Sequence, residues 1–359
     1  GPGANIKRDP LCGRNFEYFS EDPYLTGKLA AGHIRGVEST GVSASLKHFA
    51  CNSQEYKRFS SDSVMDERTL REIYLAGFET AVKEGNPSTV MCAYNKLNGE
   101  HCSDSKLLLT DILRTEWGFD GMVVTDWGAM SDRIRAFRAG CDLNMPGGSA
   151  YMEKEAAQAV RDGTLREADI DRCAGRVLRL VEKAAGAIQK AGPADMEAHY
   201  RLAKRAAEES AVLLKNDGAL LPLGESGRVA FIGHMAKELR YQGAGSSHIN
   251  PWKLTGVLDA CPEAPFAEGC AANGSTTEEL LRQAAEAART AEAAVVFAGL
   301  TDQYESEGFD REDMKMPEGH NRLIEAVAAA NPNTVVVLFC GSPVELPWAD
   351  QVKAILYMG

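Results

Sequence analysis

The sequence predicts an α/β fold divided between two domains, and three observations point to it. In the first 150 residues, short apolar runs alternate with helical stretches, and β-then-α units of this length favour parallel strands with right-handed crossovers. Two helical stretches, 152–190 and 195–215, then form a bridge. After the bridge, new apolar runs alternate with alanine-rich helical segments, as expected of a second, open α/β sheet.

The elements of the first half follow from periodicity and from their end signals. In the stretch 66–84, Leu70, Ile73, Phe78 and Ala81 fall on one helical face. Gly118 ends another helical stretch. On these grounds we expect helices over 22–40, 66–84, 106–117 and 134–139, and strands over 42–48, 89–94, 122–126 and 140–145.

The second half predicts strands at 229–233, 294–299, 334–339 and 354–357, with helices at 277–291 and 321–330. Gly233 follows a strand, but no G-x-G-x-x-G pattern continues from it, so no dinucleotide cofactor is predicted. The expected domains are therefore 1–190, a linker with a bridging helix at 191–215, and 216–359.

Composition narrows the classes of function. The formal net charge is −12, which argues against nucleic acid or an anionic membrane surface as the main partner but not against a neutral substrate. No apolar run approaches 18 residues, so we expect no membrane span. The nine cysteines are an odd number without a C-x-x-C pair. This pattern favours reduced thiols in a cytoplasmic protein over disulfides or a metal site.

Asp126 is the most informative candidate residue. It follows the apolar Val123-Val124 pair and precedes Trp127 and a turn glycine. Active sites of α/β barrels lie at such carboxyl ends of strands, where a carboxylate beside an indole can act as a nucleophile or stabilise a cationic sugar. The alternative at this point is a helix N-cap.

Other polar residues stand at predicted strand ends or in a loop. Lys47-His48, Tyr94-Asn95 and Asp142 follow apolar runs, and their convergence on one face would form a pocket, although each alone is compatible with an ordinary strand end. The run 305–311 holds acids around a glycine. It is either a solvated loop or the source of a second carboxyl, which glycoside hydrolysis needs.

Together these stretches resemble glycoside hydrolase family 3, in its β-glucosidase and β-xylosidase branch. The matching segments are Gly-Arg-Asn-Phe-Glu-Tyr-Phe-Ser-Glu-Asp-Pro at 13–23, Lys-His-Phe-Ala-Cys-Asn at 47–52 through Arg58, 90–95, 124–129, 242–247 and 305–311. The resemblance runs along essentially the whole chain, in family order. It implies a (β/α)8-type barrel followed by an α/β sandwich, with the active site between them and no cofactor or metal.

The resemblance also implies a retaining mechanism and its residues. Asp126 would be the nucleophile and Glu307 the acid/base, with Glu305 as the competing choice. The residues on the family's substrate-binding positions are Arg14, Lys47, His48, Arg58, Met91, Tyr94 and Trp127. The expected activity is an exo-acting β-glucosidase on terminal β-D-glucosyl units. A β-xylosidase, a glycoside phosphorylase and a non-catalytic sugar-binding fragment stay open.

The chain is short for this plan. A (β/α)8 barrel takes about 250 residues, and roughly 190 precede the second predicted domain. We therefore expect an incomplete barrel and a truncated sandwich, as in an internal part of a larger enzyme. An open barrel exposes apolar edges, so we expect either a homo-oligomer or a second polypeptide that completes the fold.

Overall fold

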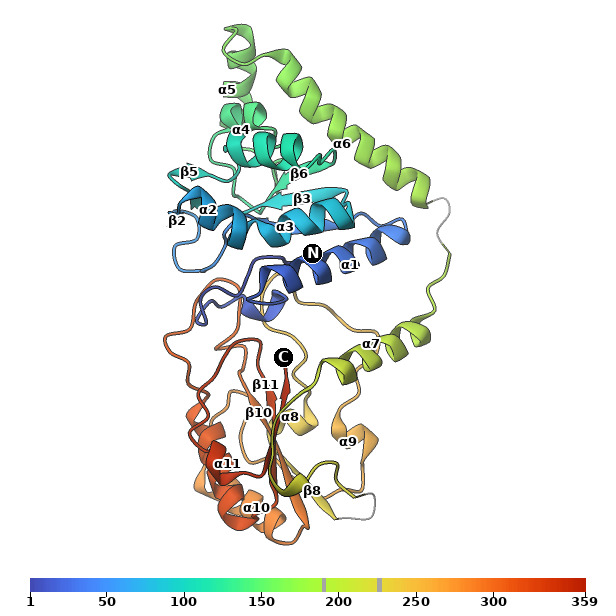
Figure 1. The fold of residues 1–359 in the computed structure, drawn as a ribbon, viewed down its shortest axis with the longest axis vertical. Helices are drawn as coiled ribbons and strands as arrows, with labels where there is room; N and C mark the ends of the chain where they lie inside the picture. Colours follow the sequence, from blue (N-terminus) through green and yellow to red (C-terminus); the bar gives the residue numbers. More distant parts are fainter. Residues whose placement is uncertain (189–191, 225–227) are drawn as a thin grey trace. The chain divides into compact units, whose positions relative to one another are not determined.

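The computed structural model describes residues 1–188, 192–224 and 228–359 (Figure 1). Its contacts divide the chain into two compact units. Unit 1 comprises Gly1–Asp9 and Tyr18–Pro193, and unit 2 comprises Pro10–Glu17 and Ala194–Gly359. The segment 10–17 thus belongs to unit 2, although the chain on both sides of it belongs to unit 1. The expected boundary at 190–191 lies outside the described residues.

Unit 1 is built on a parallel sheet in the order β1-β3-β6, with β1 at Ser45–Phe49, β3 at Thr89–Cys92 and β6 at Met122–Thr125. Single parallel bridges from Gly3 to Lys47 and from Val124 to Leu143 extend it at both edges. The sheet does not close among the described residues. This open parallel arrangement confirms the predicted α/β class and the incomplete barrel.

Helices cover this sheet and connect its strands. They are α1 (Pro23–Ser39), α2 (Glu67–Thr69), α3 (Ala76–Thr80), α4 (Arg133–Ala139), α5 (Ala150–Arg161) and α6 (Glu167–Ile188), with the π-helical stretches η2 (Leu70–Tyr74), η3 (Ala81–Gly85) and η4 (Leu107–Glu116). Asp22 caps α1 by accepting from the Leu25 amide at 2.6 Å. A Cβ on Gly27 would approach Thr80 Cβ to 2.7 Å, so glycine permits the close packing of α1 on α3.

Unit 2 holds a six-stranded sheet in the order β7-β12-β11-β10-β8-β9. The strands are β7 (Val212–Asn216), β8 (Val229–Ile232), β9 (Phe266–Ala267), β10 (Ala293–Gly299), β11 (Thr334–Phe339) and β12 (Ala354–Met358). All pair in parallel except β7, which is antiparallel to β12. Strands buried on both faces explain the nearly continuous apolar runs that marked this half of the sequence.

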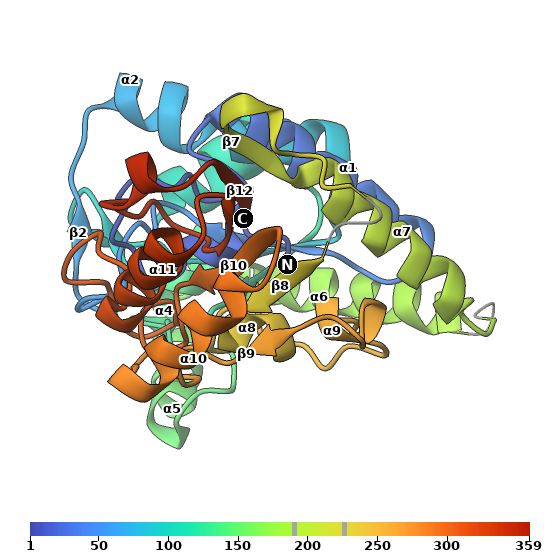
Figure 2. The same cartoon turned by 90° about the horizontal axis from the view of Figure 1, so that it is seen from below.

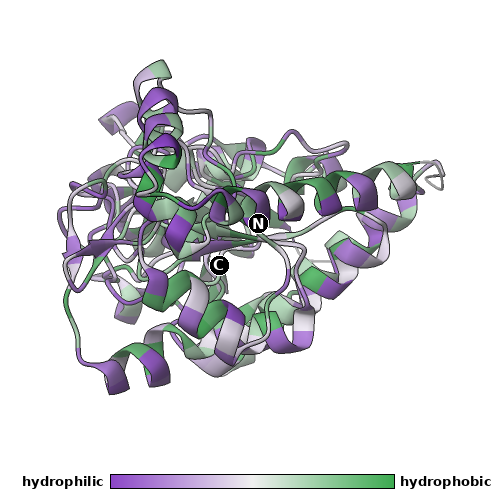
Figure 3. Cartoon of the chain, turned by 90° about the horizontal axis from the view of Figure 1, so that it is seen from above, coloured by the Kyte–Doolittle hydropathy of each residue, from purple (hydrophilic) through white to green (hydrophobic). Residues whose placement is uncertain are grey.

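Alternate residues of β10 pack on opposite faces of the sheet. Val296 joins the core beneath α10 (Glu278–Arg289) and α11 (Glu318–Ala330), whereas Val295 and Phe297 join a separate cluster on the other face. Figures 1 and 2 show α10 and α11 on the same side of this sheet. In Figure 3 the helices of the chain carry both hydrophobic and hydrophilic turns, as expected for helices that cover a sheet on one face.

Three local features differ from the sequence-based expectations. The helix predicted to reach residue 215 ends earlier, as α7 (Met196–Ser210), because the residues that follow, Val212–Asn216, pair with β12 as strand β7. Over its described part, to residue 188, the stretch 152–190 holds two helices, and Gly163, at φ +72°, lies between them. The expected strand at 140–145 is reduced to the single bridge at Leu143.

The remaining elements are short. Unit 1 has a small sheet of β2 (Asp62–Ser63), β4 (Lys96–Leu97) and β5 (Glu100–His101). Unit 2 has the helices η1 (Asn15–Glu17), η5 (Asp217–Ala219), α8 (His234–Lys237), α9 (Val257–Ala260) and η6 (Ala349–Gln351). Among the described residues, none of the helices combines the length and the apolar character needed to cross a membrane.

Candidate active site

Asp126 is the first residue after β6, and its two carboxylate oxygens have different surroundings. Its amide donates to the Cys92 carbonyl at 3.2 Å, which ties it to the end of β3. Oδ1 accepts from the Trp127 amide at 2.8 Å. Oδ2 is buried, and no hydrogen-bond partner for it exists within the described residues. One oxygen is therefore anchored, and the other is available to a bound ligand.

His48 lies beside that second oxygen. Its Nε2 is 3.6 Å from Asp126 Oδ2, and its Nδ1 is 3.1 Å from the Tyr18 hydroxyl. That hydroxyl in turn accepts from Asn52 Nδ2 at 3.1 Å. Asn5 fixes the His48 backbone through bonds of 2.8 and 3.0 Å.

These contacts are mutually consistent for one tautomer of His48. The Tyr18 hydroxyl has two acceptors within reach, His48 Nδ1 at 3.1 Å and the Asn52 carbonyl at 3.5 Å. When it donates to the nearer one, Nδ1, the imidazole proton resides on Nε2 and faces Asp126. Sequence reasoning had not singled out Tyr18, Asn52 or Asn5, although the first two stand inside the motifs at 13–23 and 47–52.

The other expected residues of unit 1 follow the same ends of the strands. The Arg58 guanidinium lies 4.4 Å from the centre of the Tyr94 ring and pairs with Glu55 at 2.7 Å. Met91 is on β3, opposite Val124 in the register. Lys47 is in β1, and Trp127 is 51% exposed directly after Asp126. Because parallel strands share one carboxyl edge, this edge carries most of the expected pocket residues.

Asp142 does not join this group. Its side chain is fully buried and binds Arg114 at 2.8 Å, Arg176 at 2.9 Å and the Val123 amide at 2.8 Å. A carboxylate saturated by two guanidinium groups and a backbone N–H holds the sheet and helices together, so the expectation that this strand end lines a pocket is wrong.

Glu307 belongs to unit 2, in the loop after β10. Its Oε2 accepts from the Ser246 amide at 2.9 Å, and its Oε1 is 3.4 Å from Arg14 Nη1. Arg14 also pairs with Glu17 at 2.5 Å. The segment 10–17 is held on this loop by two further bonds, Gly13 N to Asp310 Oδ1 at 3.0 Å and Arg311 N to Leu11 O at 2.8 Å.

Glu305, the competing carboxyl, also binds one backbone amide and one arginine, but it is more deeply buried than Glu307. Oε1 accepts from the Gly341 amide at 2.7 Å, and Oε2 is 3.4 Å from Arg240. Burial raises the pKa of the Glu305 carboxyl, and Arg240 acts in the opposite direction. Its side chain is 3% exposed, against 13% for Glu307. The geometry gives Glu305 a role in positioning the loop and leaves Glu307 the more accessible of the two.

The described residues contain no group of three or more histidine, cysteine or acidic side chains that could hold a metal ion. What the structure offers instead is a set of carboxylates with distinct environments. Carboxylates can act on a glycosidic bond as nucleophile and acid/base without a metal.

The chain matches two family models that together cover most of its length. Residues 1–180 match the glycosyl hydrolase family 3 N-terminal domain, and residues 211–359 match the C-terminal domain of the same family.

Individual relatives agree with these matches. The chain is 53% identical to thermostable β-glucosidase B of Acetivibrio thermocellus, across 100% of this chain and 49% of that protein. It is 46% identical to an exo-α-(1→6)-L-arabinopyranosidase of Bifidobacterium longum, across 99% of this chain and 49% of that protein. The crystal structure of a Bifidobacterium adolescentis family 3 β-glucosidase superposes with a TM-score of 0.94 at 45% identity, covering 100% of this chain and 54% of that one.

This chain thus spans about half the length of the curated relatives it matches. The two family models follow one another in the order of the two units, and the solved structure shares the fold over the whole chain. The chain belongs to glycosyl hydrolase family 3.

Proposed function

We propose that the protein is a glycoside hydrolase that removes terminal β-D-glucosyl residues with retention of configuration. The support is the 53% identity, over the whole chain, to a protein named as a β-glucosidase. Because the chain spans about half of that relative, the proposal concerns the whole protein to which these residues belong.

In this proposal Asp126 is the nucleophile, and the observation that carries it is the asymmetry of its carboxylate. The Trp127 amide holds Oδ1, whereas Oδ2 is buried without a hydrogen bond among the described residues. Oδ2 attacks the anomeric carbon, the glycosidic oxygen leaves, and a covalent glycosyl-enzyme forms. Nε2 of His48 lies 3.6 Å from the same oxygen.

Glu307 is the proposed acid/base. It gives its proton to the departing oxygen, then takes a proton from the water that hydrolyses the intermediate. The greater exposure of its side chain, 13% against 3% for Glu305, favours Glu307 for this role. We further propose that Arg14, Lys47, His48, Arg58, Met91, Tyr94 and Trp127 bind the sugar.

The first experiment compares Asp126→Asn with Asp132→Asn, a half-buried helix cap on the following loop. We expect Asp126→Asn to lower kcat about 10³-fold or more at unchanged stability, and Asp132→Asn to keep most of it. Peptide mapping after incubation with 2-deoxy-2-fluoro-β-glucosyl fluoride should place one adduct on the Asp126 peptide. An adduct on another carboxylate would overturn the assignment.

A second experiment separates the two glutamates. Glu307→Gln should accumulate glycosyl-enzyme from substrates with good leaving groups, and azide, a nucleophile that needs no base, should restore turnover and release a β-glycosyl azide. Glu305→Gln should lose stability instead, because Arg240 and the Gly341 amide lose a buried anionic partner. Azide rescue of Glu305→Gln and not of Glu307→Gln would reverse the two roles.

The 46% identity to an exo-α-(1→6)-L-arabinopyranosidase supports a pentopyranosidase as the second candidate. A pentopyranosyl unit lacks the hydroxymethyl group of glucose, as xylose does. The ratio of kcat/KM for aryl β-D-glucoside, β-D-xyloside and α-L-arabinopyranoside decides between them. No turnover of any of the three by the whole protein would favour a non-catalytic sugar-binding function.

Two further expectations stay proposals. An odd number of cysteines without a C-x-x-C pair supports a cytoplasmic location, because such a compartment keeps thiols reduced. Association with a second copy or a completing polypeptide follows from the unclosed sheet of unit 1. Light scattering at several protein concentrations would test the association, since a single monomer mass throughout would exclude self-association.

A further inference from the structure

The sheet of unit 2 has a topological switch point. From β8 the chain first adds β9 on one side, then crosses back to add β10 on the other side, and continues outward through β11 and β12. The connection after β8 therefore runs toward β9, and the connection after β10 runs the opposite way, toward β11. The carboxyl ends of β8 and β10 lie side by side where these two connections diverge. In open α/β sheets, ligands bind in the crevice outside such neighbouring ends.

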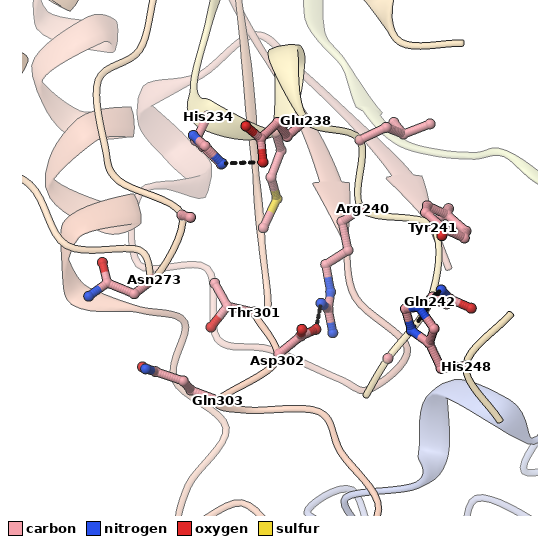
Figure 4. Close-up of a pocket in the computed structure, with 14 residues that line it drawn as sticks. His234, Glu238, Arg240, Tyr241, Gln242, His248, Asn273, Thr301, Asp302 and Gln303 are labelled. Carbon is pink, nitrogen blue, oxygen red and sulfur yellow. Dashed lines mark hydrogen bonds and ion pairs between the residues drawn. The ribbon is translucent and has the colours of Figure 1, made fainter. Parts of the chain in front are cut away.

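A cavity of about 410 Å³ lies at this point of the sheet (Figure 4). His234 follows β8, Asn273 comes from the segment after β9, and Thr301, Asp302 and Gln303 follow β10. Every residue that lines the cavity belongs to unit 2. This volume lies within the range typical of small-molecule sites.

Thr301 gives the cavity an unused polar group. Its side chain is 5% exposed, and its Oγ1 has no hydrogen-bond partner within the described residues. Its carbonyl accepts from the Tyr304 and Glu305 amides, which fixes the residue in place. Figure 4 shows Thr301 in the middle of the lining residues, between Asn273 and Asp302. A buried hydroxyl without a partner is costly unless a ligand satisfies it.

The charges around the cavity disfavour an anionic ligand. Arg240 is already paired with Asp302 at 2.5 Å and with Glu305 at 3.4 Å. His234 lies 3.0 Å from Glu268 and 3.4 Å from Glu238. Two acids, Glu238 and Asp302, line the cavity with one arginine, Arg240, which is already paired, so no unpaired arginine or lysine of the lining is left for a phosphate or carboxylate.

The same side chains suit a neutral ligand with many hydroxyl groups. Carboxylates accept hydrogen bonds, amides such as Asn273 and Gln303 both donate and accept, and Thr301 can do either. Tyr241, which is 42% exposed, adds an aromatic face at the rim for the apolar side of a sugar ring. We propose that unit 2 carries a sugar-binding site at its switch point, made of these residues and independent of Asp126.

Met235 lines the cavity and supplies a reporter. The protein carrying Asp126→Asn, which should not consume the probe, is labelled with ¹³C at the methionine methyl groups, and Met235→Leu assigns the resonance. We expect cellobiose to shift the Met235 signal saturably at millimolar concentration. Met91, from β3, reports separately on binding near Asp126. If wild-type protein hydrolyses no glycoside but Met235 still responds, the proposed activity fails and this site stands.

Thr301→Val removes the hydroxyl and keeps the side-chain shape. Because that hydroxyl has no partner in the free protein, stability should be unchanged or higher, while the cellobiose Kd at Met235 rises about threefold to tenfold. Thr290→Val, at the end of α10 and outside the cavity, is the matched control and should leave the Kd unchanged. A Met235 signal that stays fixed, or one that responds to inorganic phosphate or to spermidine instead of cellobiose, would overturn the proposal.

Discussion

Asp142→Asn tests whether a buried carboxylate of unit 1 serves stability rather than catalysis. The substitution keeps the shape of the side chain but removes its charge. In the structure the carboxylate binds Arg114 and Arg176 through separate oxygens and also accepts from the Val123 amide. It thereby links β6 to α6 and η4.

The size of the effect follows from what the substitution leaves behind. Burial already lowers the pKa of Arg114, which shows how poorly its charge is solvated. Removal of one partner from a buried ion pair costs about 3–5 kcal/mol. Asparagine retains one acceptor oxygen, so we expect the lower end, about 3 kcal/mol. For a unit of this size that corresponds to a fall in Tm of roughly 6–12 °C.

Asp120→Asn is the matched control. Asp120 pairs at 3.5 Å with Arg179 of α6, the helix that also carries Arg176, but its side chain is 92% exposed. An exposed pair contributes at most about 0.5 kcal/mol here. Urea unfolding of both variants, with the m-value compared to that of wild type, measures the difference. Equal free energies of unfolding for the two variants would refute the argument from burial.

Three further predictions concern single side chains. Tyr18→Phe removes the hydroxyl beside His48 Nδ1 and should lower kcat about tenfold, which corresponds to an activation free energy higher by roughly 1.4 kcal/mol. The ¹⁵N shifts of the imidazole should then show a mixture of tautomers. Unchanged shifts would contradict a positioning role for Tyr18. Burial lowers the pKa of His320 to about 4, so the unfolded state takes up the proton first as pH falls below about 6.5. Stability present at neutral pH is then lost between pH 6.5 and 4, by about 2 kcal/mol at pH 5, and His320→Gln should lose less over that range. Finally, the structure describes all nine cysteines, and Cys261 is the exposed one. Brief alkylation of native protein should therefore label the Cys261 peptide first. Rapid labelling of another cysteine would contradict the burial of the other eight.

Much of the fold was predictable because its signals are local. The apolar runs at 89–94, 122–126 and 334–339 became β3, β6 and β11 with small shifts of their ends. The strand β7 escaped prediction because it follows a helix directly and is defined by pairing with β12, more than 130 residues away. The switch point of unit 2 likewise depends on strand order, which periodicity does not reveal.

The residues of the candidate site carry signals in the sequence, but the contacts that hold them in place do not. Motifs marked Asp126, His48 and Arg58, whereas the chain of contacts through Tyr18 to Asn52 depends on segments that only the folded chain brings together. Segment 10–17 is the clearest case. Nothing in its sequence indicates that Arg14 packs with the loop after β10 and not with the barrel strands that surround it in sequence.

Three acids of the chain, Asp126, Asp142 and Glu305, differ in the number of groups that bind their oxygens. Asp142 and Glu305 have both oxygens bound to arginines or backbone amides, so neither can turn toward a substrate without leaving a buried donor unsatisfied. Asp126 has one oxygen fixed by a single amide and the other without a hydrogen bond among the described residues. Sequence pattern places all three acids at strand ends or in a motif, and only the number of their partners distinguishes them. Variants of the saturated acids should therefore fail in stability before they fail in chemistry, and variants of Asp126 should do the reverse.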